Sequence, residues 1–520
     1  MARTGQRGRV RLTLAEIAGI TGGQLLGGDP ETAVSSYSID TRTLVPGALF
    51  VALRAERDGH DFVCDALDRG AAGALVSRAV DVVRRGQVKP PSLVLVDDTA
   101  AALTTLGRAA RDRLEEPRRH RLSSGSSRLG GVPVVGITGS TGKTSTKDLT
   151  AAALAPVGPV GASPVSFNNE IGVPLTLLSA PPGAVAVVVE MGARGVGHIA
   201  TLAAVARPTI GVITNIGMAH AEFFGSREEV ARAKGELLEA LPDDGHAVLS
   251  ADDDMTPGLR ARTGAAVLVA GASAGADVMV SAVRLDDELR PAFHLDTPWG
   301  SADVPPLPVR GAHQAGNAAF AVAVAAIVGV SLEDAVAGLA GAVGSPLRMD
   351  LRRSPAGLVV LNDSYNANPT SMAAAVDALA GLGAGRRFAV LGRMAELGPH
   401  ATAEHHRLGK LVAAAGVDTL VVVAGGPQPG QPGGDTSPEL AALAEGAREN
   451  GVEAVVVVGP EAAVGALAPR LRPGDAVLVK ASRVAGLEQV AAALLDWSAG
   501  GSGVPPGQGR REPPKKGSAS

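Results

Sequence analysis

The chain has 520 residues, of which 46% are hydrophobic and 19% charged, so it is long enough for about three globular domains. Its 48 basic and 52 acidic side chains give a formal net charge of −4, which argues against nucleic acid as a partner because no broad attraction to phosphate backbones results. The one cysteine, Cys64, excludes an internal disulfide and a zinc site built from cysteines.

Residues 1–112 are expected to form a small α/β domain. Short strand-like segments at Ala48–Leu53 and Leu93–Val96 lie in the same region as the polar run Asp40-Thr41-Arg42. Residues 113–131 are basic and then rich in serine and glycine, without a hydrophobic period, which predicts a flexible linker.

From residue 132 onward, short Val/Ile-rich runs alternate with Ala/Leu-rich helical stretches. Continuous apolar runs are typical of strands buried on both faces, so the pattern predicts an α/β class with mostly parallel sheets. We assign a central domain to 132–346, a C-terminal domain to 347–498 with a surface loop at 425–438, and a disordered tail to 499–520. The predicted strands are Val132–Ile137, Ala184–Glu190, Thr209–Thr214, Phe388–Leu391, Leu420–Val423, Ala454–Val458 and Ala476–Val479.

The longest apolar run, Ala318–Val330, is shorter than the roughly 20 residues that cross a bilayer. The basic N-terminus is not followed by the apolar core of a signal peptide. We therefore expect a soluble cytoplasmic protein without membrane insertion.

The strongest motif is residues 134–145, VVGITGSTGKTS, in which a predicted strand leads through small residues into a helix starting near Lys143. Glycines allow successive backbone N–H groups to face one anion, and the helix N-terminus adds partial positive charge. Lys143 can reach the β and γ phosphates and the Thr144 hydroxyl can bind Mg²⁺. Ile137 stands where the common pattern has its first glycine, so the motif is the shorter form G-x-x-G-K-T from Gly139. A glycine-rich turn without a ligand is the alternative, but the motif favours ATP.

Glu190 and His220 each follow an apolar strand. Taken alone, Glu190 is better explained as a helix cap and His220 as a structural histidine. Ligands collect at the carboxyl edge of an open α/β sheet, so together with the phosphate loop these side chains predict a Mg²⁺ site completed by substrate oxygens. Lys234 lies in a helical stretch, and its residue chemistry alone suggests only a solvated lysine.

Taken together, the motifs resemble the Mur ligase family over residues 12 to 495. The shared segments appear in family order, and two later ones resemble the family members that add D-alanyl-D-alanine. The shared segments are 138–144 (TGSTGKT), 168–174 (NNEIGVP), Glu190, His220, Lys234 and 311–317 (GAHQAGN), and the two later ones are 361–369 (LNDSYNANP) and 394–398 (MAELG).

The resemblance implies a three-domain enzyme: a small N-terminal α/β domain for the UDP-sugar substrate, a central phosphate-loop ATPase domain and a C-terminal Rossmann-like domain that closes over the site. It implies these nucleotide-binding residues: Gly139, Ser140, Thr141, Gly142, Lys143, Thr144, Ser145, Asn317 at the adenine, and Arg348 and Asp363 at ribose and phosphates. It implies two Mg²⁺ ions held by Thr144, Glu190, His220 and Lys234, the last as a carbamate, with Lys143, Glu190, His220 and Lys234 as the catalytic set.

For the other substrates the resemblance implies UDP-N-acetylmuramoyl-tripeptide and D-alanyl-D-alanine, acted on by a monomer. The corresponding residues are Ser38, Asp40, Thr41 and Arg42 for the UDP-muramoyl part, Asn168 and Asn169 along its route to the γ-phosphate, and Tyr365, Asn366 and Asn368 near the dipeptide.

Three positions depart from the family pattern. Gln314 replaces an asparagine but keeps an amide, Arg393 replaces an acid, and Leu347 stands where the family has glycine before Arg348. We therefore expect little effect at Gln314, a changed charge role at 393 and a different direction for Arg348.

The implied reaction forms an amide from a carboxylate, which is a poor electrophile. Transfer of the γ-phosphoryl group would make an acyl phosphate, which the dipeptide amine attacks with release of phosphate. Domain closure would exclude water from this intermediate. The alternatives are a sister ligase that adds another amino acid, a phosphate-loop switch protein that hydrolyses ATP to move a partner, and an inactive scaffolding relative.

Overall fold

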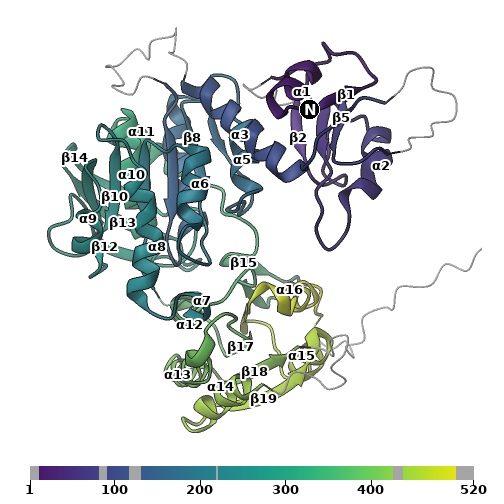
Figure 1. Ribbon diagram of the computed structural model, residues 1–520. Coiled ribbons are helices and arrows are strands. Elements are labelled where there is room, and N and C mark those ends of the chain that lie inside the picture. Colours follow the sequence, from purple (N-terminus) through teal and green to yellow (C-terminus); the bar gives the residue numbers. More distant parts are fainter. Residues whose placement is uncertain (1–10, 81–90, 116–130, 218–220, 426–436, 499–520) are drawn as a thin grey trace, which may run out of the picture. The chain divides into compact units, whose positions relative to one another are not determined.

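The computed structural model describes residues 11–80, 91–115, 131–217, 221–425 and 437–498. The chain divides into two compact units, one that runs to Ser345 and takes in the short segment 396–398, and one formed by the rest of the C-terminal part. Unit 1 contains two β-sheets and unit 2 contains one, each accompanied by helices (Figure 1). The predicted α/β class with mostly parallel sheets is confirmed.

The N-terminal sheet has the strand order β1-β5-β4-β3-β2, and all its pairings except β1 with β5 are parallel. The strands predicted at Ala48–Leu53 and Leu93–Val96 are β3 and β5. The elements of this part are α1 (Leu14–Thr21), β1 (Gln24–Leu26), β2 (Ser36–Ser38), β3 (Ala48–Val51), the 3₁₀ helix η1 (Gly59–Phe62), α2 (Val63–Asp68), β4 (Gly73–Val76), β5 (Leu93–Leu95) and α3 (Thr99–Glu115).

Helix α3 connects the N-terminal sheet to the central part of unit 1. It packs against α5 (Gly172–Leu178) so closely that a Cβ on Gly107 would lie 2.7 Å from the Cβ of Pro174. The helix continues through residues 113–115, the beginning of the predicted linker. Residues 116–130 of that linker lie outside the described ranges, as does the predicted tail at 499–520.

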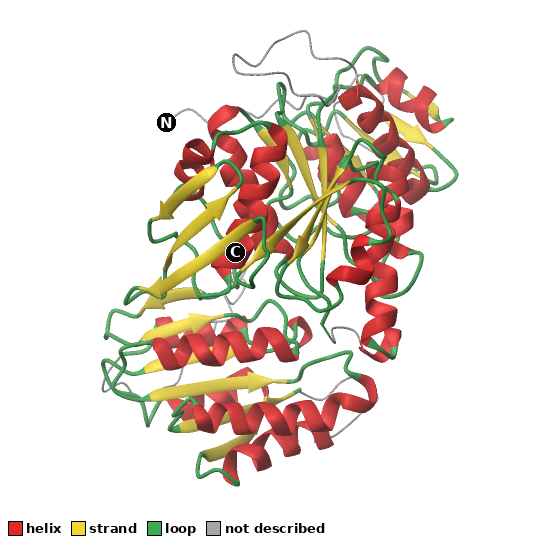
Figure 2. Cartoon of the chain, turned by 90° about the vertical axis from the view of Figure 1, so that its left-hand side faces the viewer, coloured by secondary structure: helices red, strands yellow, loops and turns green. Residues whose placement is uncertain are grey.

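The central sheet has the order β14-β13-β12-β11-β10-β9-β6-β8-β7 and is parallel from β7 to β12. Neighbouring residues of one strand, such as Val134 and Val135, belong to separate hydrophobic cores because helices cover both faces of this sheet (Figure 2). Its strands are β6 (Val134–Thr138), β7 (Val160–Ala162), β8 (Ala186–Glu190), β9 (Ile210–Ile213), β10 (His246–Ser250), β11 (Ala266–Gly271), β12 (Val278–Leu285), β13 (Pro291–Thr297) and β14 (Gly300–Val304).

This strand order positions the site, because β8 and β9 flank β6. The three carboxyl ends therefore bring the loop after Thr138, the carboxylate of Glu190 and the segment after Ile213 to one edge. The helices of this part are α4 (Lys143–Leu154), η2 (Ala155–Val157), α5, α6 (His198–Ala206), α7 (Ala221–Phe224), α8 (Arg227–Glu239), α9 (Thr256–Arg260), α10 (Gln314–Val328) and α11 (Leu332–Leu339).

Unit 2 has the strand order β15-β16-β20-β17-β18-β19, parallel except for β15. The four strands predicted in this region are β17 to β20, and most of the predicted 425–438 loop, residues 426–436, lies outside the described residues. The elements are β15 (Asp350–Arg353), β16 (Val359–Asn362), α12 (Pro369–Gly381), β17 (Arg387–Gly392), η3 (Gly398–His400), α13 (Ala401–Ala414), β18 (Thr419–Ala424), α14 (Pro438–Arg448), β19 (Glu453–Val458), α15 (Gly459–Leu467), β20 (Ala476–Lys480), η4 (Arg483–Ala485) and α16 (Glu488–Leu495).

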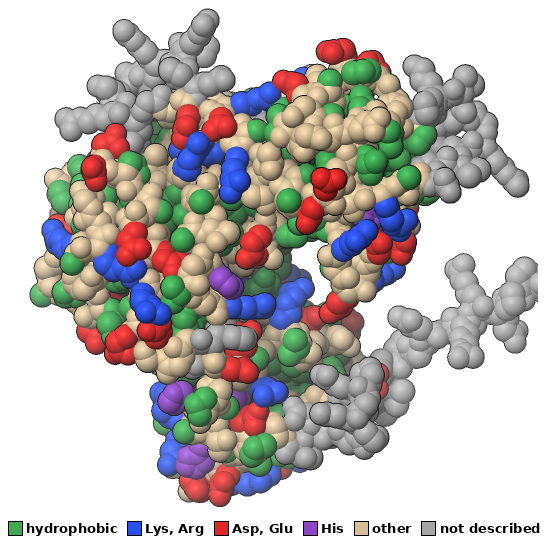
Figure 3. All heavy atoms as spheres, viewed as in Figure 1, with side chains coloured by type: hydrophobic (Ala, Val, Ile, Leu, Met, Phe, Trp, Pro, Cys, Tyr) green, Lys and Arg blue, Asp and Glu red, His purple; other side chains and the backbone are tan. Residues whose placement is uncertain are grey.

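The surface carries both signs of charge. On the face drawn in Figure 3, acidic and basic side chains are interspersed, as the near balance of 48 basic and 52 acidic residues predicts. None of the helices in the described ranges combines the length and the apolar character that a bilayer crossing requires.

At the start of unit 2, two residues that are not glycine have backbone angles that glycine adopts more easily. Leu347 has φ +62° and Met349 has φ +49°, both in the left-handed region that L-residues avoid. The Leu347 carbonyl accepts from the Tyr365 N–H at 3.1 Å, and the Met349 N–H donates to Asp363 Oδ1 at 3.0 Å. These hydrogen bonds hold the conformation although position 347 has no glycine.

We predict that Leu347→Gly is more stable than Leu347→Ala by about 1 kcal/mol, because both variants lack the leucine side chain but only alanine keeps a Cβ in the left-handed conformation. Urea unfolding of the two variants measures the difference. Equal stability would show that position 347 is not strained.

Candidate functional site

The phosphate loop has the conformation that its glycines predict. Gly139 has φ +149° and Gly142 has φ +79°, and α4 begins at Lys143 directly after them. A Cβ on Gly139 would lie 1.8 Å from Thr214 Oγ1, so only glycine fits there. Lys143 is half-buried, and its Nζ donates to the Gly139 carbonyl at 2.6 Å, which keeps the ammonium group over the loop.

Asn215, which follows β9, supports this loop from outside. Its Oδ1 accepts from the N–H groups of Ser140 at 3.1 Å and Thr141 at 3.0 Å, and its Nδ2 donates to Thr141 Oγ1 at 2.6 Å. The neighbouring Thr214 hydroxyl donates to the Thr141 carbonyl at 2.5 Å. These bonds fix Ser140 and Thr141 from the β9 side, and the N-terminal turn of α4 follows as the anion-binding end of the motif.

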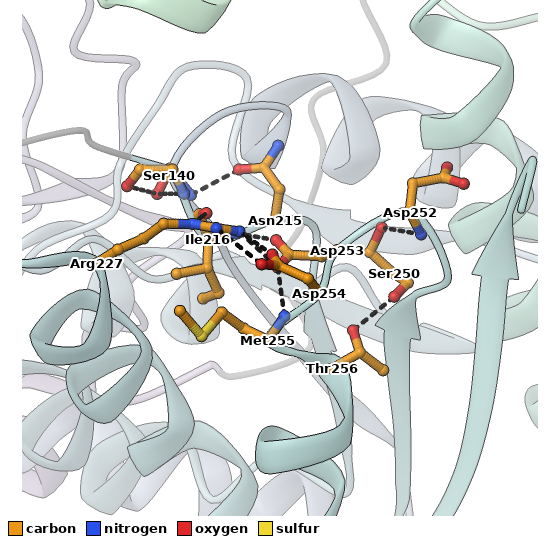
Figure 4. A network of polar contacts seen from close by, with 11 residues as sticks. Ser140, Asn215, Ile216, Arg227, Ser250, Asp252, Asp253, Asp254, Met255 and Thr256 are labelled. Carbon is orange, nitrogen blue, oxygen red and sulfur yellow. Dashed lines mark hydrogen bonds and ion pairs between the residues drawn. The ribbon is translucent and has the colours of Figure 1, made fainter.

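A second network of hydrogen bonds and ion pairs holds Ile216, the residue after Asn215 (Figure 4). Arg227, at the start of α8, donates from Nε to the Ile216 carbonyl at 2.8 Å and pairs with Asp253 at 3.1 Å and with Asp254. Asp253 in turn accepts from the Ile216 N–H. Asn215 and Ile216 are thus held by two adjacent networks, whereas His220 lies outside the described residues.

Glu190 is the centre of the polar network beside the phosphate loop. Its side chain is 2% exposed, and it accepts from Thr144 Oγ1 at 2.9 Å, from Ser166 Oγ at 2.6 Å and from Asn168 Nδ2 at 2.9 Å. A buried carboxylate needs such donors, because removal from water otherwise disfavours its charge. The helix-cap alternative does not describe this geometry, since Glu190 bonds side chains from α4 and from the 163–168 loop.

The two adjacent asparagines have different surroundings. Asn168 donates to Glu190, whereas Asn169 Oδ1 accepts from the N–H groups of Ile171 at 3.3 Å and Gly172 at 2.9 Å at the start of α5.

The 163–168 loop is linked to α4 by Lys147. This lysine is fully buried, pairs with Asp148 at 2.6 Å and donates to the Ser163 carbonyl.

Lys234 is not a solvated lysine, so the interpretation from its residue chemistry alone is wrong. It lies on α8 with a residue exposure of 2%. Burial, with the charge of Lys143 nearby as a smaller cause, lowers the pKa of Lys234 well below its ordinary value. Within the described part of the chain, no carboxylate lies within ion-pair distance of its ammonium nitrogen. The charged ammonium form is therefore disfavoured by burial.

Asn317 and Gln314 stand on α10 behind the phosphate loop. Asn317 is buried, its Oδ1 accepts from Thr146 Oγ1 at 3.2 Å, and its Nδ2 donates to Gln314 Oε1 at 2.9 Å. Gln314 Nε2 also lies 3.4 Å from Ser145 Oγ. The amide retained at position 314 therefore contacts both Asn317 and Ser145.

In unit 2 the central pair is Asp363 with Lys480, at the carboxyl ends of the adjacent strands β16 and β20. Lys480 Nζ donates to Asp363 Oδ2 at 2.6 Å and to the Asn366 carbonyl at 2.7 Å. Burial lowers the pKa of Lys480, whereas Asp363 opposes that shift. Lys480 was not predicted, although a lysine that ends an apolar strand is an unusual feature of the sequence.

The other predicted residues of unit 2 surround this pair. The Arg348 guanidinium lies against the Tyr365 ring, with Cζ 4.2 Å from the ring centroid. Asn366 is exposed, and Asn368 caps α12, since its Oδ1 accepts from the Ser371 N–H at 2.9 Å. Arg393 pairs with the nearly buried Glu439 at 2.9 Å, so the reversed charge at position 393 has a partner inside unit 2.

The predicted UDP-substrate residues lie together after β2. Ser38 Oγ donates to the Asp40 carbonyl at 2.9 Å, and Arg42 binds Asp40 through Nε at 2.9 Å and Nη2 at 2.6 Å. The hydrogen bond from Arg42 is the main reason that the pKa of Asp40 is lowered. Thr41 is buried, whereas the Arg42 side chain is 84% exposed and available to a ligand.

The oxygen donors beside the phosphate loop fit Mg²⁺. This ion prefers one or two protein oxygens together with phosphate oxygens and water, and the Thr144 hydroxyl stands 2.9 Å from the Glu190 carboxylate. No group of three His, Cys, Asp or Glu side chains suited to a metal occurs among the described residues, and a nucleotide-bound Mg²⁺ does not require one.

Ser166 and Asn215 are the site residues that sequence reasoning missed in unit 1. Each is close to a recognised feature, Ser166 two residues before Asn168 and Asn215 two residues after β9. Small polar residues at such places are common in loops, so only the folded contacts with Glu190 and the phosphate loop distinguish them.

Comparison with protein families matches residues 137–325 to the Mur ligase middle domain and residues 347–483 to the Mur ligase glutamate ligase domain. The UDP-N-acetylmuramoyl-tripeptide–D-alanyl-D-alanine ligase of Mycobacterium tuberculosis H37Rv is 41% identical, over 94% of this chain and 98% of the relative. The Escherichia coli K12 protein of the same name is 35% identical, over 80% and 86%.

Solved structures agree with these relatives. The crystal structure of MurF from Acinetobacter baumannii superposes with a TM-score of 0.74 at 29% identity, covering 94% of this chain and 99% of that one. MurF ligase from Thermotoga maritima in complex with ADP has a TM-score of 0.67 at 27% identity, with coverages of 88% and 96%.

We predict that Gly139→Ala weakens ATP binding at least about tenfold, because its Cβ would overlap Thr214 Oγ1 and distort the loop. Gly258→Ala in α9 is the matched control, since a Cβ there meets nothing within 4 Å. Calorimetric titration with ATP measures both variants, and unchanged affinity in Gly139→Ala would contradict the assigned loop geometry.

Proposed function

This chain belongs to the Mur ligase family, and from that membership we propose that it joins D-alanyl-D-alanine to the terminal carboxylate of UDP-N-acetylmuramoyl-tripeptide, using ATP. The observation that carries the proposal is the contact between Thr144 and Glu190, which places a hydroxyl and a carboxylate side by side at the start of the phosphate-loop helix. Relatives bearing this activity in their names match the chain nearly from end to end, which favours it over a sister ligase or a switch protein.

The residues of the phosphate loop account for the first step. Lys143 lies over the loop, where its charge offsets the repulsion between the triphosphate and the approaching peptide carboxylate. The carboxylate oxygen attacks the γ-phosphorus, ADP leaves, and an acyl phosphate forms. The dipeptide amine then attacks the acyl carbon, loses a proton and displaces inorganic phosphate.

We propose two Mg²⁺ ions at this site. Thr144 and Glu190 would hold the first, and Glu190, His220 and a carbamate on Lys234 would hold the second. The ions would offset the charge of the phosphate oxygens. Ser166 and Asn168 orient Glu190 for this task, since both donate to the same carboxylate oxygen.

The low pKa of Lys234 supports the carbamate. A carbamate forms when a neutral amine adds to CO₂, and an ordinary lysine is protonated at neutral pH. Burial lowers the pKa of Lys234 and so favours the neutral amine, and the carbamate that forms with loss of a proton would be an anionic oxygen donor that suits a hard metal.

The remaining roles are those that the resemblance to the Mur ligase family implies. Ser38, Asp40, Thr41 and Arg42 would bind the UDP-muramoyl part, and Asn168 and Asn169 would flank the path of the peptide. Asn317, Arg348 and Asp363 would bind the nucleotide, and Tyr365, Asn366 and Asn368 would stand near the dipeptide. We propose that the protein acts in the cytoplasm, where ATP and UDP-linked precursors are both present, and that it does so as a monomer.

Product mass spectrometry tests the function directly. Purified protein receives ATP, Mg²⁺, D-alanyl-D-alanine and UDP-muramoyl-tripeptide with either diaminopimelate or lysine at the third position. We expect a pentapeptide product with one of the two tripeptides, and phosphate release that requires both peptide substrates. Phosphate release without them would favour the switch protein, and a product only with a single amino acid would favour a sister ligase.

We predict that Lys143→Ala and Glu190→Gln each lower the ligation rate by about 10³-fold or more, because each removes a charge that acts on the reacting groups. Glutamine keeps the size of the buried Glu190 side chain, and far-UV circular dichroism checks that both variants are folded. Lys410→Ala, at an exposed lysine of α13, is the control and should leave the rate unchanged. Near-normal turnover in either site variant would contradict these roles.

We further predict that ligation depends on CO₂. Activity should fall in buffers stripped of CO₂ and return with bicarbonate, and intact-protein mass spectrometry under mild conditions should detect one added CO₂. Lys234→Ala should be nearly inactive with or without bicarbonate. If the wild-type ligation rate is the same with and without CO₂, the mechanism does not use the carbamate.

A further inference from the structure

Two arginines of unit 2 lie against one aromatic ring. The guanidinium carbon of Arg348 is 4.2 Å from the Tyr365 ring centroid, and that of Arg483 is 5.1 Å from it. Among the described residues no carboxylate lies within 4 Å of either guanidinium, and Arg348 Nε is buried without a hydrogen-bond partner. Two cations held together without an acid nearby form a site for anions.

The backbone holds this cluster at the ligand-binding edge of the sheet. Arg483 begins η4 three residues after the end of β20 at Lys480. Ser482 fixes that turn, because its Oγ accepts from the Ala395 N–H at 2.9 Å and its N–H donates to the Arg393 carbonyl at 3.1 Å. Tyr365 is fixed from the other side by its hydrogen bond to Leu347. Arg483 itself is exposed, so its guanidinium is accessible.

The local charges do not cancel. Lys480 is already paired with Asp363, which leaves the positive charges of Arg348 and Arg483 for ligands. Two kinds of anion take part in the proposed reaction, the phosphates of ATP and the free carboxylate at the far end of the incoming dipeptide. Two adjacent guanidinium groups match these two anions.

We propose that Arg483, steadied on the Tyr365 ring, binds the C-terminal carboxylate of D-alanyl-D-alanine, while Arg348 serves the nucleotide. The inference rests on the proposed function and names the residue that selects a dipeptide with a free acid end. A planar guanidinium binds a carboxylate through two parallel hydrogen bonds, and the ring face favours the cation. Anchoring the acid end leaves the amine free to attack.

The first experiment uses Arg483→Gln and Arg483→Lys in the full-length protein. We expect Arg483→Gln to raise KM for D-alanyl-D-alanine by about 10- to 100-fold, the effect of losing a charge-assisted pair, with KM for ATP changed less than twofold. Arg483→Lys should recover part of the loss, because it keeps the charge but not the planar fork. Arg407→Gln, at an exposed arginine of α13 paired with Glu404, is the matched control.

The second experiment changes the substrate and needs no variant. D-alanyl-D-alanine amide has the same reacting amine but no carboxylate, so the wild type should use it about 10- to 100-fold less well in kcat/KM than the acid. Arg483→Gln should lose most of that preference, which a variant with merely weakened folding would not do.

The outcomes distinguish a failure of the Arg483 proposal from a failure of the proposed ligase function. If the wild type makes no pentapeptide, the proposed function fails. If it makes pentapeptide but prefers neither the acid nor the amide, or if Arg483→Gln keeps the preference, the role of Arg483 is wrong. A rise in KM for ATP instead of the dipeptide would assign Arg483 to the nucleotide and would also overturn the proposal.

Discussion

The carboxylate of Glu190 organises the polar site of unit 1. It is buried at the end of β8, where an uncompensated charge would be costly, and it is stabilised by three donors from two different segments. Those donors include the Thr144 hydroxyl of the phosphate-loop helix, so one interaction couples the loop, the β8 strand end and the 163–168 loop. The chemistry expected at the γ-phosphate depends on that coupling, because the same oxygens would bind Mg²⁺.

Unit 2 also has a buried charge at a strand end, but there the buried group is a cation. Lys480 is buried at the end of β20, and Asp363 together with the Asn366 carbonyl keeps it hydrogen-bonded. The pair supports the loop that carries Tyr365, and this loop holds two guanidinium groups near one ring. Each unit therefore has one buried charge whose hydrogen-bond partners are part of the predicted ligand-binding groups: Glu190 in unit 1 and Lys480 in unit 2. These hydrogen bonds order the groups before a ligand binds.

The departures from the family pattern show how local contacts preserve a site. Arg393 finds Glu439, and Gln314 joins Asn317 through the amide that it shares with asparagine. Leu347 instead adopts a left-handed backbone that glycine would adopt more easily, and the hydrogen bond from Tyr365 helps to hold it there. Arg393 and Gln314 thus have hydrogen-bonding or ion-pair partners in the fold, whereas Leu347 keeps a strained backbone conformation in place of glycine.

The α/β class, most of the long buried strands and the phosphate loop could be predicted from the sequence, because each depends on local patterns: continuous apolar runs, glycines at a turn and a lysine at a helix start. The sequence also indicated that Glu190 belongs beside that loop. The fold was needed to see that Lys234 is buried, that Asn168 but not Asn169 reaches Glu190, and that Ser166, Asn215, Lys480 and Arg483 join the sites. The physical reason is that burial and hydrogen-bond partners depend on which strand ends lie side by side, and residue order along the chain does not record that arrangement.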